Sequence, residues 1–530
     1  MDALIFYAIA AGGIFALFFL VRFLVFLSNR THLFTIPVSR HFTLPVLVAQ
    51  HRFLGPWTRA EVFLYITYIV INIFLVFFRA GAMTDISRRA GTLALINLIF
   101  PLSTIHISSL ADLLGIYLQT CQKIHRATSW MVIVLISVHI VMSLAKGPQF
   151  LLSESRNLYT TIGAGSLGAL TLLSLPLCRR WSYEVFLRGH QALVGLFVYG
   201  VWRHLPIRDR LPGVYLTVAL ALLGLNLVVP LLFFLYRNGL LAGRGAPRAI
   251  LSYAYQGATK EGGDDGTVSA IRVRLSLPRP LKVDAGQYIN LWIPGVGLGA
   301  WTQTHPFAVT SWSRGNQNTF ELLVWPRQGL SKDLLRHVQA VPDSSISFLA
   351  LFSGPHGISE DVSHCESALV VASGVGIAAV IPYVKKMIYG YNTCTSQVRR
   401  VHLVWQVESK DVAISAQEQL NRLLEDDTVD DGYILHISIY VERGLKRDQQ
   451  QLGKHKRACL YQGVPHYESL VALESSGELI ERLPNIRDEQ GQLQVLVSTT
   501  DTIRFRLREI VRQYLHERVK LSELEYQPRG

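Results

Sequence analysis

Two apolar stretches, IHRATSWMVIVLISVHIV at residues 124–141 and RGHQALVGLFVYGVWRH at residues 188–204, each carry a pair of histidines 14 residues apart. In an α-helix, 14 residues rise by about 21 Å and return to within about 40° of the starting direction. The two members of each pair therefore share one face of a helix, at two depths of a membrane core about 30 Å thick.

The four histidines are candidate metal ligands, because ionisable side chains inside membrane helices are costly and usually functional. If both helices cross in the same direction, His125 is level with His190 and His139 with His204. Two level pairs predict two heme groups, each with two axial imidazoles. A lone membrane histidine often makes only an interhelical hydrogen bond; His106 has no partner at this interval and is given no redox role.

Seven stretches have the roughly 20 apolar residues that a membrane-spanning helix needs. They lie at about residues 4–27, 60–79, 91–118, 126–146, 158–178, 185–205 and 212–236. The first is interpreted as a retained helix and not a signal peptide, because it is too long and has no early basic region. The third contains Pro101 and several polar residues, so we expect it to kink or to lie partly at the interface.

Composition excludes several classes of protein. Of 530 residues 50% are hydrophobic, and the apolar residues concentrate in the first 236. The net charge of +13 comes from dispersed basic residues without the stripe that a phosphate backbone requires, which argues against nucleic-acid binding. The five cysteines form no C-x-x-C pair, which argues against disulfides and cysteine-bound metal.

The segment after residue 237 reads as two soluble domains. Short alternating runs broken by Gly, Pro and Asp, from residue 246 to about 353, predict a small antiparallel β-barrel. From residue 367 onward, apolar strands alternate with helical stretches, as expected of a parallel α/β domain.

The sequence HPFAVTS at residues 305–311 resembles the flavin-binding stretch of the ferric reductase family, and the spacing of the four histidines matches that family too. The resemblance assigns to FAD the residues His305, Pro306, Phe307, Thr310 and Ser311. Gly329 and Ser331 open a helical stretch whose free N–H groups suit a pyrophosphate.

A glycine-rich turn, Gly374-Val375-Gly376, follows an apolar strand and precedes a helix, the context in which glycines admit a dinucleotide phosphate. It resembles the family's nicotinamide-nucleotide site. Two departures stand out: the family's G-P-Y-G turn reads Gly354-Pro355-His356-Gly357, and its Cys-Gly-Pro reads Ser498-Thr499-Thr500. The tyrosine's stacking is then lost or taken over by His356. Ser498, nearly isosteric with cysteine, is assigned to the nucleotide, with less efficient hydride delivery.

The resemblance implies a seven-helix transmembrane heme bundle, then a β-barrel FAD-binding domain and an α/β nucleotide-binding domain. The predicted boundaries are an N-terminal helix and loop at residues 1–59, the heme domain at 60–240, the flavin domain at 246–357 and the NAD(P) domain at 366–530.

The implied function is an NADPH-dependent ferric-chelate reductase with FAD and two b hemes. It would be a multi-pass protein of the plasma membrane, in contact with the lipid bilayer and with ferric chelates as acceptor. No side chain is assigned as catalytic, and the sequence names no protein partner. Two alternatives stay open: a superoxide-generating NADPH oxidase, and a heme-containing membrane partner with a decayed nucleotide site. Such oxidases usually space the second histidine pair one residue closer and lack the first helix.

Overall fold

The structure is a computed structural model. It describes residues 36–528 except 49–55, 146–152, 177, 179–182, 206–209, 241–242, 244, 255–269, 298–299, 302, 327–328, 341–344, 428–432, 446–447, 453–456 and 482–489. Its contacts separate two compact units. Unit 1 comprises Met1–Leu110 and Gln119–Val229, and unit 2 comprises Ala111–Leu118 and Pro230–Gly530. The predicted helix at residues 4–27 lies outside the described residues.

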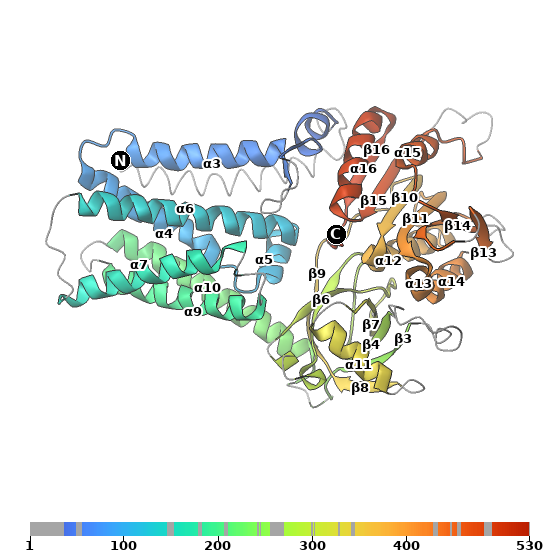
Figure 1. The fold of residues 1–530 in the computed structure, drawn as a ribbon, viewed down its shortest axis with the longest axis horizontal. Coiled ribbons are helices and arrows are strands. Elements are labelled where there is room, and N and C mark those ends of the chain that lie inside the picture. Colours follow the sequence, from blue (N-terminus) through green and yellow to red (C-terminus); the bar gives the residue numbers. More distant parts are fainter. Residues whose placement is uncertain are drawn as a thin grey trace. The chain divides into compact units, whose positions relative to one another are not determined.

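Long helices make up unit 1 (Figure 1). Their bounds are α3 Arg59–Phe77, α4 Met83–Leu102, α5 Ile107–Leu114, α6 Leu118–Leu144, α7 Ser155–Leu173, α9 Tyr183–His204 and α10 Arg210–Arg237, where α5 and α10 continue into unit 2. A capping box starts α3: the Thr58 side chain accepts the Glu61 N–H, and the Glu61 carboxylate accepts the Thr58 N–H. Before it lie a short π-helix, η1 Ser39–Thr43, and the paired strands β1 Val46–Val48 and β2 Trp57–Thr58.

The kink expected in the third stretch is present. Helices α4 and α5 meet at an angle of 98° across a short break after Leu102. Pro101 lies in the last turn of α4, and the hydroxyls of Ser103 and Thr104 donate to the carbonyls of Ile99 and Pro101. The same two carbonyls also accept the backbone N–H groups of Ser103 and Thr104, so each of these residues bonds to the end of the helix through its backbone and its side chain. Polar residues of this stretch thus form hydrogen bonds at the point where the helix bends.

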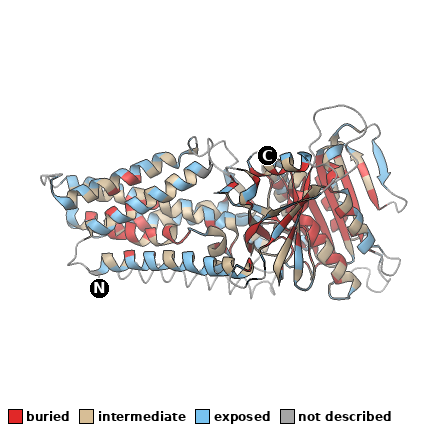
Figure 2. Cartoon of the chain, turned by 90° about the horizontal axis from the view of Figure 1, so that it is seen from below, coloured by how far each residue is buried: buried red, intermediate tan, exposed pale blue. Residues whose placement is uncertain are grey.

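Within the described residues, three helices are long and apolar enough to cross a membrane, or four if α4 and α5 form one broken span. The three are α3, α6 and residues 211–237 of α10. Many of their apolar side chains are exposed, as the pale blue of these helices in Figure 2 shows; Leu64, for example, is 66% exposed. Exposed apolar side chains on long helices fit contact with lipid. A total of seven spans stays a prediction.

Two antiparallel sheets and a helix form the region predicted to bind flavin. The four-stranded sheet has the order β7-β4-β3-β8, and the three-stranded sheet has the order β6-β5-β9. The bounds are β3 Arg248–Tyr253, β4 Ile271–Leu281, β5 Tyr288–Trp292, β6 His305–Ala308, β7 Gln317–Val324, α11 Leu330–Ala340, β8 Ile346–Leu349 and β9 Leu351–His356. Strands of both sheets, with α11, enclose one apolar core. The end of α10 is tied to β9, because Asn238 exchanges two hydrogen bonds with the Phe352 backbone.

A seven-stranded sheet of order β13-β14-β12-β11-β10-β15-β16 forms the rest of unit 2, and only β13 pairs antiparallel in it. Its strands are β10 Ser367–Ser373, β11 Arg400–Ser409, β12 Leu435–Arg443, β13 Gln449–Leu452, β14 Ala458–Gln462, β15 Leu493–Ser498 and β16 Val519–Glu523. Its helices are α12 Ile377–Asn392, α13 Lys410–Ser415, α14 Gln417–Asp426, α15 Tyr467–Ser475 and α16 Asp501–Tyr514. Every residue of β10 is buried, as expected of a parallel strand covered on both faces. The α/β prediction is confirmed.

Candidate functional site

The structure brings the four candidate histidines together in two pairs. The ring centroids of His125 and His190 lie 6.3 Å apart, and those of His139 and His204 lie 6.1 Å apart. Two metal–imidazole bonds of about 2.0 Å, plus the half-widths of two rings, add to about 6 Å. Each pair therefore leaves room for one metal ion between its rings, so the donor set and the spacing both fit a heme iron.

Three of the four histidines have a hydrogen-bond partner at Nδ1. His125 Nδ1 lies 2.8 Å from Thr104 Oγ1, His139 Nδ1 lies 2.8 Å from the Ser87 carbonyl oxygen, and His204 Nδ1 lies 2.8 Å from Thr160 Oγ1. His190 differs: its Nδ1 is buried and, among the described residues, has no hydrogen-bond partner. In metal-bound histidines, the ring nitrogen that does not bind the metal usually makes a hydrogen bond, as the Nδ1 atoms of His125, His139 and His204 do.

The partners Ser87, Thr104 and Thr160 were missed by reasoning from the sequence. Hydroxyl side chains within apolar stretches were the available signal, but it does not say which histidine each one meets. Ser87 also precedes the predicted third span, whereas the structure starts α4 at Met83. Only the packing of the helices against each other decides these contacts.

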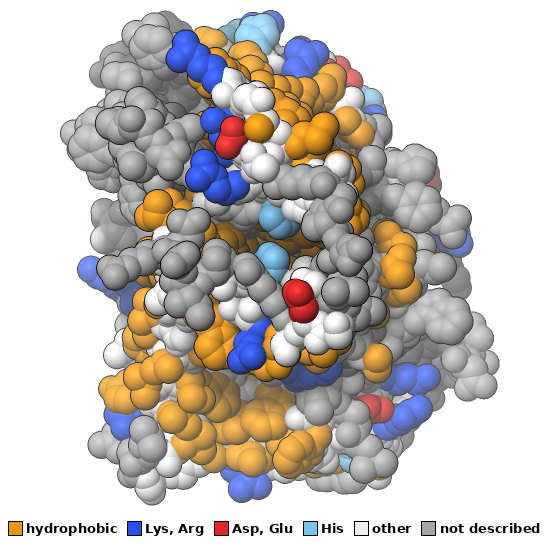
Figure 3. All heavy atoms as spheres, turned by 90° about the vertical axis from the view of Figure 1, so that its left-hand side faces the viewer, with side chains coloured by type: hydrophobic (Ala, Val, Ile, Leu, Met, Phe, Trp, Pro, Cys, Tyr) orange, Lys and Arg blue, Asp and Glu red, His pale blue; other side chains and the backbone are white. Residues whose placement is uncertain are grey.

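Close packing of α7 and α9 supports the His139–His204 pair. A Cβ on Gly200 would lie 2.8 Å from the Cα of Gly163, so the two backbones meet where neither has a side chain. Glycine contacts of this kind let membrane helices approach closely. Thr160 and His204 lie within one turn of this contact and bond to each other. Figure 3 shows the face of the molecule at which α7 begins and α9 ends. Histidine side chains are visible there among hydrophobic ones.

The predicted flavin residues lie together along β6 and the loop that follows it. Pro306 is exposed, and His305 and Phe307 are half-buried. Thr310 is buried, and both its N–H and its hydroxyl donate to the Glu321 carbonyl. Ser311 Oγ accepts the Glu321 N–H. The two hydroxyls expected at the flavin therefore hold this loop to β7, while the HPF strand itself is accessible.

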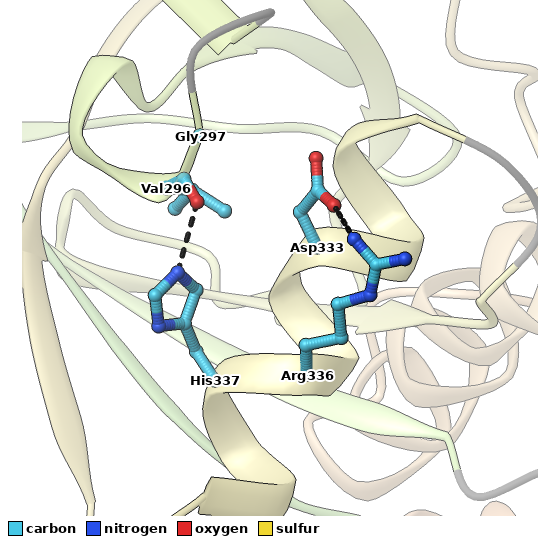
Figure 4. A pocket seen from close by; sticks show the side chains of 5 residues that line it. All are labelled: Val296, Gly297, Asp333, Arg336 and His337. Atoms are coloured by element: carbon cyan, nitrogen blue, oxygen red, sulfur yellow. Dashed lines mark hydrogen bonds and ion pairs between the residues drawn. The ribbon is translucent and has the colours of Figure 1, made fainter.

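Gly329 and Ser331 flank the first residue of α11, as predicted. Gly329 has a φ of +63°, which favours glycine, and its carbonyl accepts the N–H groups of Lys332 and Asp333. A pocket of about 440 Å³ lies further along α11, lined by Val296, Gly297, Asp333, Arg336 and His337 (Figure 4). In it His337 Nε2 donates to the Val296 carbonyl, and Arg336 pairs with Asp333. None of these residues was predicted to bind flavin.

The structure brings the predicted nucleotide residues Gly374, Gly376 and Ser498 together at the ends of β10 and β15. A Cβ on Gly376 would lie 2.1 Å from the Ser498 carbonyl oxygen, so this contact requires glycine. Ser498 is fully buried, and its hydroxyl donates to the Tyr526 carbonyl. Gln527 accepts the Thr499 N–H and donates to the Val497 carbonyl. The segment after β16 thus binds the strand end that carries the Ser-Thr-Thr sequence.

His356 does not project into open space. It is buried; its Nδ1 pairs with Asp112 and its Nε2 lies 3.2 Å from Ser353 Oγ. Glu525 accepts the N–H of Leu118, which belongs to the same segment as Asp112, and burial raises the pKa of this glutamate. Both ring nitrogens of His356 therefore have partners within the protein.

Comparison with known families agrees with this arrangement. Residues 90–201 match the family described as ferric reductase like transmembrane component, and residues 267–360 match an FAD-binding domain. Ferric/cupric reductase transmembrane component 2 of Saccharomyces cerevisiae is 23% identical over 273 residues, covering 51% of this chain and 34% of that protein. The probable cell surface ferric reductase kap2 of Aspergillus oryzae is 24% identical over 360 residues, covering 63% of this chain and 44% of that protein.

The chain thus spans less than half the length of these relatives. Among solved structures, a ferredoxin-NADP+ reductase from Plasmodium falciparum covers 52% of this chain and 95% of its own, at 12% identity and a TM-score of 0.34, which is too low to establish a common fold. The resemblance predicted from the sequence is confirmed by the two family matches: this integral membrane protein contains a ferric reductase like transmembrane component followed by an FAD-binding domain.

Proposed function

We propose that this protein is a transmembrane ferric-chelate reductase, which moves electrons from NADPH through FAD and two bis-histidine hemes to ferric iron on the opposite side of the membrane. The observation that carries the proposal is the two histidine pairs with ring separations of 6.3 and 6.1 Å, within a segment that matches a ferric reductase like transmembrane component. The names of the relatives support ferric iron as acceptor, and the similarity to the cell surface ferric reductase kap2 supports the plasma membrane.

The residues of the chain have distinct tasks in this proposal. His125 and His190 hold the inner heme, and His139 and His204 hold the outer heme, in a bundle of seven spans. The HPF strand, with Gly329 and Ser331, binds FAD, and Gly374, Gly376 and Ser498 bind NADPH. When bound, flavin turns a hydride into single electrons and heme carries them, so the protein supplies orientation and insulation.

One observation favours a second candidate, a heme-containing membrane partner without nucleotide turnover. Ser498 is fully buried, and its hydroxyl is bonded to Tyr526. A nicotinamide approaching Ser498 would have to displace this C-terminal segment. The two candidates share the hemes and differ in electron entry.

The experiment uses sealed vesicles that contain the full chain, supplied with FAD. NADPH should reduce the bound heme as fully as dithionite does, and ferric EDTA on the far side should then be reduced. If dithionite reduces the bound heme and NADPH does not, the reductase proposal is wrong and the non-catalytic partner remains. Cytochrome c reduction that superoxide dismutase abolishes, in place of chelate reduction, would identify a superoxide-generating oxidase.

A further inference from the structure

The four candidate ligand histidines differ in what their Nδ1 atoms contact, and the difference follows the helices. Both histidines of α6, His125 and His139, bond to the α4 segment, which we define as residues 83–104. This segment contains no histidine. His204 of α9 bonds to Thr160 on α7, and His190 has a buried Nδ1 without a partner among the described residues.

The Thr104 hydroxyl fixes the proton on His125. Thr104 Oγ1 lies 2.6 Å from the Pro101 carbonyl oxygen and 2.8 Å from His125 Nδ1. The carbonyl can only accept, and two oxygens this close repel each other unless a proton lies between them. The single hydroxyl proton is therefore donated to Pro101, and Thr104 accepts the N–H of His125. The neutral ring of His125 carries its proton on Nδ1, which leaves the Nε2 lone pair available for a metal.

A backbone carbonyl of α4 likewise fixes the position of the proton on His139. The Nδ1 of His139 lies 2.8 Å from the carbonyl oxygen of Ser87, an obligate acceptor, so Nδ1 carries the proton. The ring reaches this carbonyl because residue 91, one turn later, is glycine: a Cβ there would lie 3.0 Å from Nδ1 and 3.3 Å from Cε1 of His139. Ser87 Oγ also lies 3.2 Å from Nδ1 and 2.8 Å from Ser143 Oγ.

We propose that the α4 segment is an orienting element that sets the tautomer, ring orientation and basicity of both α6 ligands. This inference rests on the proposed function, in which these histidines hold hemes. An acceptor at Nδ1–H makes an imidazole a stronger donor to its metal and so stabilises the oxidised iron. Removing the Thr104 acceptor should raise the midpoint potential of the inner heme. An alanine at position 91 should turn the His139 ring and change the outer heme.

The rival explanation is that these hydrogen bonds only satisfy buried polar groups between packed helices. In that case their loss destabilises the bundle without a selective effect on one heme. The orienting role makes a more specific prediction, because substitutions at residues 91 and 104 of the α4 segment should act on different hemes. For a Thr104 variant, an unchanged outer heme shows that the bundle is still folded. For a Gly91 variant, an unchanged inner heme shows the same.

The experiment is a redox titration of membranes that contain the full chain, with electron paramagnetic resonance of the two low-spin ferric hemes. Thr104→Val removes the acceptor at constant volume, and Thr104→Ser restores it. Thr92→Val is the matched control, because Thr92 is a buried threonine of α4 whose hydroxyl, among the described residues, bonds to the Arg88 carbonyl alone. Gly91→Ala is compared with Gly168→Ala, where an added Cβ meets nothing within 4 Å.

We expect Thr104→Val to shift one midpoint potential upward and leave the other in place, with Thr104→Ser and Thr92→Val unchanged. Gly91→Ala should alter the resonance of the other heme, and this comparison decides the proposal if Thr104→Val does not accumulate. Two unaltered hemes in both variants would overturn the orienting role while leaving the reductase intact. Wild-type membranes without heme would overturn the proposed function itself.

Discussion

The Nδ1 atom of His356 lies 2.6 Å from Oδ2 of Asp112, a residue 244 positions earlier in the chain. The second carboxylate oxygen of Asp112 accepts the Gly357 N–H at 2.9 Å. One carboxylate therefore binds two consecutive residues of the turn in which the sequence departs from the family's G-P-Y-G. The turn between the flavin and nucleotide regions is tied to the 111–118 segment by this carboxylate.

Removing either partner of this pair should destabilise unit 2. In Asp112→Ala the buried His356 ring and the Gly357 N–H both lose an acceptor, at a cost of about 1–3 kcal/mol. We expect a double-mutant cycle with His356→Gln to give a coupling free energy of about 0.5–3 kcal/mol, measured by denaturant unfolding of solubilised protein followed by flavin fluorescence. The exposed Asp361–His364 pair is the control. Equal coupling in both pairs would contradict this prediction.

His139→Ala should remove one of two hemes and abolish transmembrane chelate reduction. The reason is that the outer pair loses one of its two imidazoles, while the inner pair, on the same helices, keeps both. Heme per protein is measured from the absorbance of the pyridine complex, and reduction is measured with ferric EDTA outside the vesicles. His106→Ala, in the break between α4 and α5, should retain both hemes. Unchanged chelate reduction in His139→Ala would exclude the proposed electron path.

Gly376→Ala should block electron entry and spare the hemes. The backbone of Gly376, with φ −61° and ψ −19°, suits any residue, so the effect is steric: the Cβ would lie 2.1 Å from the Ser498 carbonyl. A shift of about 1 Å at the nucleotide site can slow a reaction on the order of 100-fold. NADPH-dependent flavin reduction, followed by stopped-flow absorbance, should fall accordingly while dithionite still reduces heme. Gly315→Ala, which meets no atom within 4 Å, should have wild-type rates.

The nucleotide region should lose stability in mild acid because of His436. Burial first, and then the positive charge of Arg400, lower the pKa of this histidine to about 4. The unfolded chain binds the proton at about pH 6.5, so the folded state loses stability as pH falls from about 6.5 to about 4. His436→Asn should flatten this dependence in denaturant titrations at pH 5 and pH 7.5. The exposed His364→Asn serves as the control; identical slopes in all three proteins would rule out His436 as the cause.

Much of the arrangement was predictable because it depends on local periodicity. An interval of 14 residues fixes the face and the depth of two histidines on a helix, whatever surrounds it. The apolar runs likewise located α3, α6 and α10, and the Gly374–Gly376 turn after an apolar strand located the start of α12. Helix ends were less accurate: α6 begins at Leu118 and not near residue 126, because polar residues at its start do not prevent helix formation.

Contacts between distant segments were not predictable, because no local pattern encodes them. The Thr310 hydroxyl donates to the carbonyl of Glu321 on a neighbouring strand, a contact that the sequence did not predict. Nothing in the sequence pairs His356 with a carboxylate of the 111–118 segment, yet the structure brings the two together.

The sequence by itself determined the two pairs of histidines, the flavin stretch and the order of the regions, since spacing along a helix and turn chemistry act within one segment. Only the tertiary structure decided which helix meets each histidine ring, because side-chain hydrogen bonds form wherever packing brings a donor and an acceptor together. Ser87 and Thr104 are ordinary polar residues in the sequence. They become partners of His139 and His125 because α4 packs against α6, and because glycine at position 91 lets the ring reach the backbone.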